Sequence, residues 1–501
     1  MRELEIAMNP NKLVKHLKKP ASEFTKYDLI KFIDDHEIEM LNFRYIGEDG
    51  KLKTLNFVIT SKDYLESILS TGERVDGSSL FSYIDADSSD LYVIPRYRTA
   101  FINPFAAQPT LDILCSFYTK DGKPLESAPE YILKKASDLF TKETGYTFKA
   151  MGELEYYIIG KKDNLYPAKD QKGYHTSAPF TNWEQLRIEA MQTIAQCGGK
   201  IKYGHSEVGN FTSDGVSYEQ HEIEFIPVAA EQAVEQLIIA KWILRMLGEK
   251  YGVTISFAPK ITVGKAGSGL HIHMLIEKEG VNYMADEIGL SDIGKKFIAG
   301  ILGRAQSLTA FGNTIPTSYL RLVPHQEAPT MVCWGDSNRS VLVRVPLGWI
   351  AKTNMIKDAN PQERGEVPYI PGKQTVEFRA PDGSADLYHL LAGMILAAKE
   401  GLLQDTSLEK AKQCYVNVNI FDKEHQDLYN SLKSLPNSCY QSARYLKQDR
   451  DFYQEDGVFP KGTIDGFIHK LQSYDDENLS ERLYQKTEKI QELVNEYLHC
   501  M

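Results

Sequence analysis

Four short segments constrain this chain most, because each alternates ionisable and apolar residues in the pattern of a β-strand. Each segment holds a pair separated by one apolar residue: Glu153 and Glu155, Glu222 and Glu224, His271 and His273, and Glu377 and Arg379. Successive side chains of a strand point to opposite faces, so both members of a pair lie on the same face. The segments therefore predict several strands, each with one ionisable face.

Taken singly, these pairs also have ordinary explanations. The two glutamates of the first segment could lie on an exposed strand face, although the following run from Tyr156 to Ile159 indicates a buried strand. The histidines could be a structural pair, and Glu377 could form a salt bridge with Arg379. Taken together, several carboxylates with fewer imidazoles favour a hard divalent cation, Mg²⁺ or Mn²⁺, whereas Zn²⁺ prefers cysteine or more histidine.

The segment 318–346 carries three arginines and a glutamate among mostly apolar or small residues: Arg321, Glu327, Arg339 and Arg344. Arginines in apolar surroundings need anionic partners, because an unpaired buried charge is unstable. Guanidinium groups match carboxylates and phosphates, so the segment predicts a pocket for a negatively charged small molecule. Divalent cations together with arginines are what phosphoryl transfer requires. The sequence has no P-loop of the form Gly-x-x-x-x-Gly-Lys-Ser/Thr.

Composition excludes some classes of function. The 501 residues include 57 basic and 68 acidic side chains, for a net charge of −11. A general nucleic-acid binder would instead have a basic surplus. The N-terminus lacks the apolar run of a signal peptide, and charged residues interrupt the most apolar helical segment, 233–252, so no membrane span is expected. Six scattered cysteines without a Cys-x-x-Cys pair predict reduced thiols in a cytoplasmic protein.

The pattern along the chain predicts two domains of the α+β class. Residues 1–24 are expected to form a peripheral arm, residues 25–120 a small α+β unit, and residues 121–501 a larger domain that is mostly helical from about 405. The small unit should begin with a helix at 25–36 and a hairpin of strands at 38–46 and 51–59. Longer helices are predicted at 128–143, 182–196, 231–251, 293–312, 385–402 and 479–498.

Many short motifs occur in one order along the chain. They are Asp76-Gly77-Ser78-Ser79, Gly152-Glu153-Leu154-Glu155, Lys172-Gly173-Tyr174, His205-Ser206-Glu207-Val208, Gln220-His221-Glu222, Pro259-Lys260, Gly267-Ser268-Gly269-Leu270-His271-Ile272-His273, Arg321 to Glu327, Asn338-Arg339-Ser340, Arg344, and Glu377-Phe378-Arg379-Ala380-Pro381-Asp382. In these motifs and their order the chain resembles the glutamine synthetases of the prokaryotic type, which are ATP-dependent glutamate–ammonia ligases.

The resemblance implies a particular architecture and assembly. The small unit would be an N-terminal β-grasp domain, and the larger one a C-terminal catalytic domain with a curved antiparallel sheet flanked by helices. The family also implies a homo-oligomer, a dodecamer of two stacked hexameric rings with each active site shared between neighbouring subunits. The expected ligands are L-glutamate, ammonium, ATP and two or three Mg²⁺ or Mn²⁺ ions per site.

The resemblance also implies residue roles. One metal would be held by Glu153, His271 and Glu377, and another by Glu155, Glu207 and Glu222. Glutamate would be bound by Arg321, Arg379 and Gly267. ATP and the transferred phosphoryl group would be bound by Arg339, Arg344, His273 and Lys373. Glu327 would lie on a flap that closes the site, and the ammonium site would be formed by Tyr174 with Asp76 and Ser79, Asp76 being contributed by the neighbouring subunit.

Several positions depart from the family pattern. Ala266 replaces an asparagine that helps to hold glutamate, Leu275 replaces a serine near the nucleotide, Ser206 replaces a histidine, and His325-Gln326 precede the flap glutamate. These departures keep open a γ-glutamyl ligase that uses a larger amine, such as a polyamine or ethanolamine. A third hypothesis is a non-catalytic structural relative. That hypothesis predicts lost metal ligands, whereas all six are present.

Overall fold

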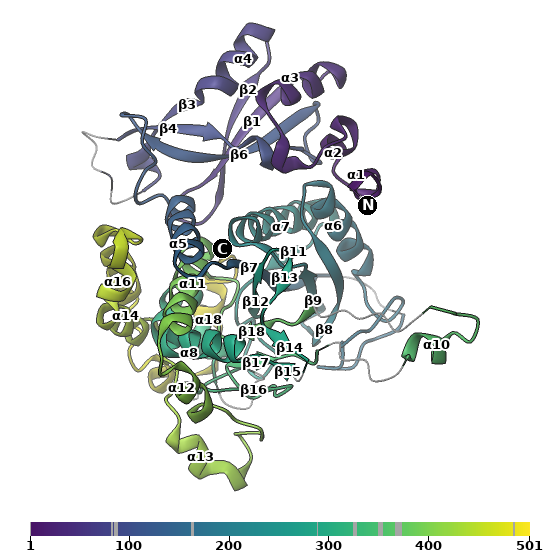
Figure 1. Cartoon of the computed structure of the whole chain (residues 1–501). Coiled ribbons are helices and arrows are strands. Elements are labelled where there is room, and N and C mark those ends of the chain that lie inside the picture. Colours follow the sequence, from purple (N-terminus) through teal and green to yellow (C-terminus); the bar gives the residue numbers. More distant parts are fainter. Residues whose placement is uncertain are drawn as a thin grey trace.

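The computed structural model describes residues 2–81, 84, 89–161, 165–287, 289–323, 328–348, 354–365, 373–483 and 486–500. They form a smaller N-terminal domain above a larger domain (Figure 1). This arrangement, with a β-grasp domain followed by a mixed α+β catalytic domain, confirms the predicted fold class.

The N-terminal domain is a sheet with the strand order β2-β1-β6-β4-β3, in which β5 also pairs with β6. Its strands are β1 (Met40–Ile46), β2 (Leu52–Val58), β3 (Glu73–Asp76), β4 (Asp90–Pro95), β5 (Phe101–Ile102) and β6 (Thr110–Thr119). Its helices are α1 (Arg2–Met8), α2 (Lys12–Leu17), α3 (Lys26–Asp35) and α4 (Lys62–Thr71). The predicted hairpin is confirmed as β1 and β2, paired from Met40 opposite Val58 to Ile46 opposite Leu52.

The residues predicted as a peripheral arm pack against this domain. Helix α2 begins after Asn11, whose side chain accepts a hydrogen bond from the Leu13 N–H at 2.8 Å. Leu13 and Val14 are buried in the same apolar cluster as Phe43 of β1. Burial of these two side chains attaches the first residues to the domain core.

A buried carboxylate lies on the central strand β6. Asp112 is fully buried and accepts hydrogen bonds from Asn42 Nδ2 at 2.8 Å, from Arg44 at 2.9 Å and from Asn103 Nδ2 at 3.2 Å. The Arg44 guanidinium also lies 4.6 Å from the ring centroid of Trp242, in the larger domain. Asp112 therefore belongs to a polar network in which its neighbours satisfy its charge.

The larger domain is built on a curved sheet with the strand order β16-β17-β18-β12-β7-β9-β8. Its main strands are β7 (Thr147–Gly160), β8 (Ile201–Ser213), β9 (Val216–Phe225), β12 (Leu270–Lys278), β16 (Trp334–Asp336), β17 (Val343–Val345) and β18 (Val376–Phe378). Three short strands lie off this order: β10 (Val228–Ala229) and β11 (Thr254–Ser256) pair with β7, and β13 (Val281–Asn282) pairs with β12. A separate two-stranded ladder joins β14 (Ala285–Asp286) to β15 (Gly289–Leu290).

Helices cover one face of this sheet. Five helices lie where the sequence predicted them: α5 (Pro129–Thr144), α6 (Glu184–Gln196), α7 (Ala230–Tyr251), α8 (Asp292–Gly312) and α11 (Leu387–Leu403). Gly152 of β7 faces α7 so closely that an added Cβ would lie 2.9 Å from Leu237 Cδ2. The even-numbered residues of β7 therefore pack on α7, and Glu153 and Glu155 face the other way.

The C-terminal region is helical, as predicted. Its helices are α12 (Ser407–Gln413), α13 (Gln426–Ser431), α14 (Cys439–Gln448), α15 (Arg450–Gln454), α16 (Lys461–Ser473), α17 (Leu479–Leu483) and α18 (Thr487–Glu496). The prediction of one helix over 479–498 was wrong. Lys486 has φ −103° and ψ 66°, outside the helical region, so α17 and α18 are separate helices.

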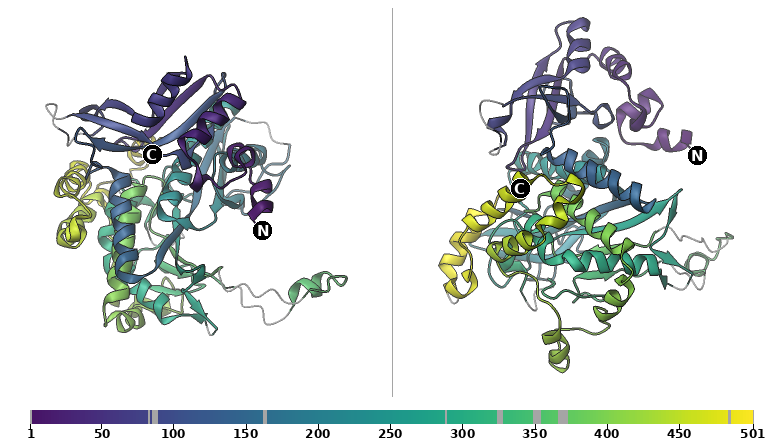
Figure 2. Two further views of the ribbon diagram at one scale, coloured as in Figure 1. Left: turned by 45° about the horizontal axis from the view of Figure 1, so that its top comes forward. Right: turned by 60° about the vertical axis from the view of Figure 1, so that its left-hand side comes forward.

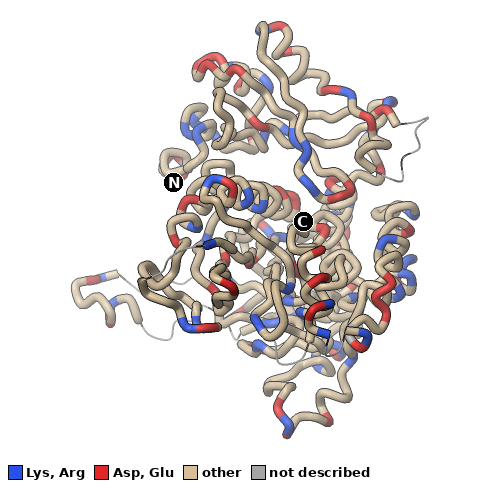
Figure 3. The backbone as a smooth tube through the Cα atoms, turned by 180° about the vertical axis from the view of Figure 1, so that it is seen from behind, with Lys and Arg blue, Asp and Glu red and all other residues tan. Residues whose placement is uncertain are grey.

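Two further short helices, α9 (Ser318–Arg321) and α10 (Met355–Ala359), lie between the last sheet strands, and α10 projects from the domain. All six cysteines are free, and three of them are buried. In the part of the chain that the structure describes, no helix is long and apolar enough to cross a membrane. Basic and acidic residues are interspersed over both domains (Figure 3).

Candidate active site

The register of the sheet brings the predicted pairs together around the central strand β7. Glu153 lies opposite His271 on β12 and opposite Glu224 on β9. Glu155 lies opposite Glu222. Hydrogen-bond pairing of four antiparallel strands thus assembles residues that are far apart in the sequence.

One group of possible metal ligands joins Glu153, His271 and Glu377. His271 Nδ1 lies 3.0 Å from Glu153 Oε2 and 3.3 Å from Glu377 Oε1. The other ring nitrogen, Nε2, accepts a hydrogen bond from Arg321 at 3.2 Å. A guanidinium can only donate, so Nε2 is the acceptor in this contact. The remaining nitrogen, Nδ1, faces the two carboxylates.

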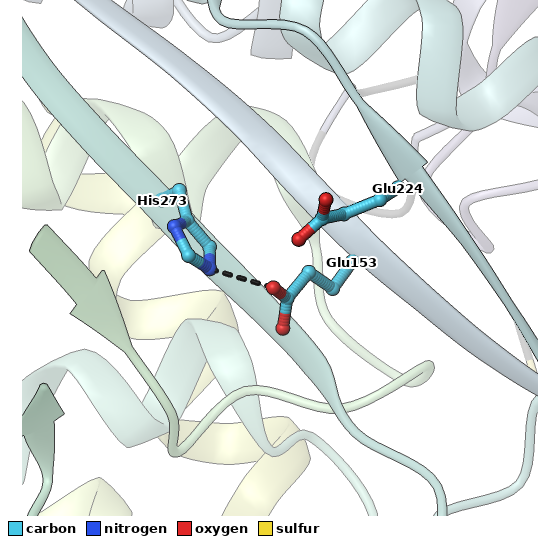
Figure 4. A group of neighbouring side chains, drawn as sticks. All are labelled: Glu153, Glu224 and His273. Carbon is cyan, nitrogen blue, oxygen red and sulfur yellow. Dashed lines mark ion pairs between the residues drawn. The ribbon is translucent and has the colours of Figure 1, made fainter. Parts of the chain in front are cut away.

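A second group shares Glu153 and adds Glu224 and His273 (Figure 4). His273 Nε2 lies 2.8 Å from Glu153 Oε1, while its Nδ1 contacts Thr375 Oγ1 at 2.8 Å. Lys202 Nζ lies 2.6 Å from Glu224 Oε2, on the outer side of the group. Glu153 therefore stands between two sets of ligands.

The third group differs in one member from the predicted set. It joins His205, Glu207 and Glu222, with His205 Nε2 3.0 Å from Glu222 Oε2. Glu155, which was predicted here, instead accepts hydrogen bonds from the Gly269 N–H at 2.7 Å and from Gln220 Nε2 at 3.1 Å. The metal role of Glu155 stays a prediction.

Glu207 reaches the third group from a strand whose pairing is irregular. Glu207 lies on β8, where the pairing with β9 shifts register between Ser206 and Asn210. Such an irregularity redirects side chains locally, and Glu207 joins His205 and Glu222 in the third group.

The electrostatics of these groups are those of a site lacking positive charge. Burial, together with repulsion from neighbouring glutamates, raises the pKa of Glu222 well above its usual value. Burial and the hydrogen bond shared with Glu153 raise the pKa of Glu224 to about 7. Burial also acts to raise the pKa of Glu153. The charge of His273 and the hydrogen bonds from His271 and His273 outweigh burial and hold this pKa well below its usual value.

These residues fit divalent cations. Carboxylate oxygens dominate the donor sets, which is the chemistry that Mg²⁺ and Mn²⁺ prefer. A divalent cation would also remove the repulsion that raises the pKa of Glu222. The groups of three therefore have both the ligand type and the charge deficit of metal sites.

Buried arginines lie beside the candidate cation sites. Arg321 and Arg379 are buried, with 4% and 6% exposure. Arg321 donates to the carbonyl of Ala380 at 2.8 Å, and Arg379 Nε donates to Glu377 Oε1 at 3.0 Å. Arg344 also donates to Glu377, at 2.9 Å, so this carboxylate contacts two guanidinium groups. The salt bridge considered for Glu377 and Arg379 is present, and the ligand role of Glu377 stays a prediction.

Glycine is required where the loop Gly267–Gly269, called the substrate loop below, passes Arg321. A Cβ at Gly269 would lie 2.5 Å from Arg321 NH2 and 2.6 Å from His271 Nε2. A Cβ at Gly267 would lie 2.4 Å from the carbonyl oxygen of Pro259. Neither distance is compatible with a side chain, so glycine allows the loop to approach the arginine and the imidazole.

One large cavity, of about 1040 Å³, contains most of the predicted site. Its walls include Glu153, Glu155, Glu207, Glu222, His271, Glu377, Arg321, Arg339, Arg344, Arg379, Gly267, Tyr174, His273 and Lys373. Asp76 and Ser79 are not among its lining residues. They are exposed in the N-terminal domain, where hydrogen bonds from Ser79 and Ser78 lower the pKa of Asp76 to about 2. Glu327 and the preceding His325-Gln326 lie outside the described residues.

Sequence reasoning did not assign His205, Gln220 or Glu224 to the site, although all three line the cavity. His205 faces Glu222 across the β8–β9 ladder, and Gln220 Nε2 donates both to Glu155 and to the carbonyl of Gly267 at 2.9 Å. Both residues occur inside motifs that were recognised. The signal available was strand alternation, since Gln220, Glu222 and Glu224 are spaced two apart on β9.

Comparison with known proteins agrees with this geometry. Residues 126–487 match the family described as the glutamine synthetase catalytic domain, and residues 37–120 match the glutamine synthetase β-grasp domain. A glutamine synthetase of Clostridium saccharobutylicum is 30% identical over 437 residues, which are 85% of this chain and 90% of that protein. One of Thermotoga maritima is 27% identical over 427 residues, 84% and 89% of the two chains.

Solved structures show the same fold. Plasmodium falciparum glutamine synthetase superimposes with a TM-score of 0.74 at 21% identity, covering 93% of this chain and all of that one. A GmaS chain in complex with ADP superimposes with a TM-score of 0.70 at 18% identity, covering 91% and 99%. The chain therefore belongs to the glutamine synthetase family, whose members are ATP-dependent ligases that generally use divalent metal ions.

Proposed function

We propose that this protein uses ATP to join ammonia to L-glutamate, giving L-glutamine, ADP and phosphate. The observation that carries the proposal is a single cavity lined by all six predicted metal ligands and four arginines. Three candidate cation groups beside several guanidiniums match the needs of phosphoryl transfer to a carboxylate. A non-catalytic relative has no reason to retain three crowded groups of buried acids.

The reaction requires two steps, because a carboxylate is a poor electrophile. The γ-carboxylate oxygen of glutamate attacks the γ-phosphorus of ATP, and ADP leaves. The nitrogen of ammonia then attacks the γ-carbon of the γ-glutamyl phosphate, phosphate leaves, and a carboxylate takes the proton from nitrogen. We assign Glu327 and the neighbouring subunit's copy of Asp76 to proton removal, by the family resemblance.

The charged residues divide by their depth in the cavity. The buried Arg321 and Arg379 suit the carboxylates of glutamate, because their guanidiniums are already fixed by protein hydrogen bonds. The more exposed Arg339, Arg344 and Lys373 suit the phosphates of ATP, and the buried His273 is assigned to the same ligand by the family resemblance.

The cations would be held by three groups of residues. The groups are Glu153 with His271 and Glu377, Glu153 with Glu224 and His273, and His205 with Glu207 and Glu222. When bound, the cations would neutralise phosphate charge and favour in-line displacement. Glu155 and Gln220 hold the Gly267–Gly269 loop against this region through hydrogen bonds to its backbone. These contacts place the substrate loop beside the cation groups.

Asp76 supports a shared site between subunits. It is exposed and lies in the N-terminal domain, outside the cavity of its own chain. Its low pKa keeps it anionic, which suits binding of ammonium. We propose the family's dodecamer of two hexameric rings, in which Asp76 of one subunit completes the cavity of the next.

A second function, ligation of a larger amine, is favoured by one observation at Ala266. The backbone of Ala266 is fixed, because its carbonyl accepts from Tyr157 Oη and its N–H donates to Gln171 Oε1, both at 2.8 Å. Its side chain is only a methyl group. The cavity therefore has extra room beside Gly267 that an asparagine would fill.

The test is phosphate release with ATP, Mg²⁺ and glutamate across ammonium, ethanolamine and a polyamine. The proposal expects turnover with ammonium at a kcat/KM far above that with either larger amine. Turnover with a larger amine alone would contradict it. Asp76→Ala should lower kcat/KM for ammonium by about a hundredfold or more while leaving ATP binding unchanged. An unchanged rate in this variant would remove the case for a shared ammonium site.

A further inference from the structure

A second cavity, of about 290 Å³, lies where the two domains meet. Its walls come from the β1–β2 turn, α7, the start of α11, α16 and the residues around Cys500. Figure 2 shows the C-terminus at this junction. Among the described residues, the lining sets of the two cavities have no member in common.

The walls of this second cavity are mainly apolar and aromatic. Phe81, Ile238 and Leu387 contribute from three separate segments, and Phe467 and Tyr474 contribute from α16 and its C-terminal cap. The volume lies close to the lower end of the range of small-molecule sites, about 300–1,000 Å³, and domain junctions are frequent places for such sites. An apolar wall of this kind favours a ligand with a flat hydrocarbon surface.

Two buried polar groups in the wall lack partners. His389 and Thr463 are each 5% exposed. His389 Nδ1 lies 2.8 Å from Asp386 Oδ1, whereas neither His389 Nε2 nor Thr463 Oγ1 has a hydrogen-bond partner among the described residues. Buried polar atoms normally have partners. Because Nδ1 faces the Asp386 carboxylate at 2.8 Å, the proton of the neutral imidazole belongs on Nδ1, which leaves Nε2 as an acceptor for a donor from the occupant of the cavity.

The charged groups of the buried wall are already compensated. Lys241 Nζ donates to the carbonyl of Gly383 at 2.6 Å, and burial lowers the pKa of this amine to about 7. The Asp386 carboxylate caps α11 by accepting a hydrogen bond from the His389 backbone N–H. A ligand with a full charge would therefore find no free counter-charge in the buried part of this wall, which favours an uncharged one.

We propose that this cavity is an effector site for a small uncharged aromatic molecule that carries an N–H or O–H donor. The aromatic surface would pack between Phe81 and Phe467, and the donor would bind His389 Nε2. The assignment concerns a site separate from the proposed active site and does not depend on which amine that site uses.

The cavity wall continues into the segments that carry the substrate arginines. Thr314 Oγ1 donates to the carbonyl of Ser384 at 2.7 Å, and Ser384 Oγ donates to Asp382 Oδ1 at 2.6 Å. Asp382 Oδ2 accepts from Asn313 Nδ2, which also donates to the carbonyl of Ala380, the acceptor of Arg321. A ligand that contacts Thr314 and Ser384 is thus linked by hydrogen bonds to Arg321, giving a physical route for coupling.

Indole is the probe, because it is flat, uncharged and has one N–H donor. Benzofuran is the matched control, since it has the same shape with an oxygen in place of the N–H. Isothermal titration calorimetry on the full chain should give saturable binding of one indole per chain. Benzofuran should bind about fivefold more weakly, in line with the loss of one buried hydrogen bond. No saturable heat with indole would overturn the proposal, because the cavity would then hold only water.

Two glycines of α16 offer a matched pair of variants. An added Cβ meets nothing within 4 Å at either Gly462 or Gly466, but only Gly466 lines the cavity. Gly466→Phe should fill the cavity and weaken indole binding at least tenfold, whereas Gly462→Phe should bind as the parent does. Equal binding by both variants would place indole elsewhere and overturn the assignment.

Thr463→Val and kinetics complete the test. The hydroxyl is lost without loss of volume, and the one N–H of indole is assigned to His389, so indole binding should change less than about twofold while the fold is retained; a tenfold loss would contradict the assigned contact with His389. In the parent enzyme, saturating indole should change the KM for glutamate at least about fivefold, and Gly466→Phe should abolish that change. An unchanged KM would overturn the effector role. Absence of any ligase activity, with indole binding intact, would instead contradict the proposed function alone.

Discussion

Asp112 and Glu222 are both carboxylates buried on sheet strands, yet their surroundings act on them in opposite directions. Burial raises the pKa of Asp112 and determines the net direction, while Arg44, Asn42 and Asn103 all act to lower it. Burial raises the pKa of Glu222, and its glutamate neighbours raise it further. The comparison teaches that burial alone does not identify a ligand site. What distinguishes the two is whether the protein supplies the compensating positive charge.

The largest expected effect tests the carboxylate shared by two cation groups. Glu153→Gln should lower ATP-dependent phosphate release on the order of a thousandfold, because two groups lose the same ligand. Its melting temperature in the absence of divalent cations should fall, since Glu153→Gln also weakens the contacts with His271 and His273 that hold the pKa of Glu153 well below its usual value. Turnover near the parent value at ordinary Mg²⁺ concentrations would show that Glu153 is no ligand.

For Asp112, whose charge the protein itself compensates, we expect a loss of stability rather than a loss of activity. Asp112→Ala leaves the buried Arg44 without its partner and should lower the free energy of unfolding by about 3–5 kcal/mol. Activity per folded molecule should be retained. Asp49→Ala is the control, because it breaks an exposed Lys53 ion pair worth less than about 1 kcal/mol. Equal melting curves for the two variants would invalidate the contrast between the regions.

A smaller effect is expected from the residue that supports Glu155. Gln220→Leu removes the donor to Glu155 and Gly267, so the apparent Mg²⁺ affinity should fall by about 10–100-fold. Saturating Mg²⁺ should restore most of kcat. As a control, Gln413→Leu changes an exposed residue of α12 and should leave the Mg²⁺ titration as it is. A loss of kcat that Mg²⁺ does not reverse would mean that Gln220 acts on the substrate.

The smallest effect concerns pH in the absence of divalent cations. The pKa of Glu224 is raised to about 7 in the folded state, so the folded chain holds a proton that the unfolded chain loses near pH 4.5. Stability from this group is therefore present below about pH 4.5 and is lost as pH rises to 7. The melting temperature in EDTA should fall by several degrees between pH 5 and pH 7.5. Glu224→Gln should flatten the slope, and a parent slope of the opposite sign would contradict the assignment.

Strand alternation predicted the four ionisable pairs, because the period of two is a local property of the chain. Cross-strand partners are not local. His205 joins Glu222 through the β8–β9 register, and Glu207 reaches them through a register shift that the sequence does not mark. The same holds for Gln220, whose partners lie on β7 and in the loop before β12.

The elements were predicted best where packing and periodicity agree. Helices such as α7 and α8 have long apolar faces, and their positions were confirmed to within a few residues. The segment 479–498 is rich in charged residues, so nothing in its periodicity marks the break at Lys486. The burial of Leu13 and Val14 depends on contacts with the β-grasp core, which a short polar segment does not reveal.

The close contact of Gly152 with Leu237 has a consequence for how this protein can change over evolution. An inserted or deleted residue early in β7 would turn the strand over and carry Glu153 onto the face occupied by α7. Both sides of the sheet would then be defective, one with carboxylates against leucine and the other without its acids. Length changes in lineages that keep this chemistry should therefore accumulate in connections such as the projecting segment around α10 and be excluded from the first half of β7.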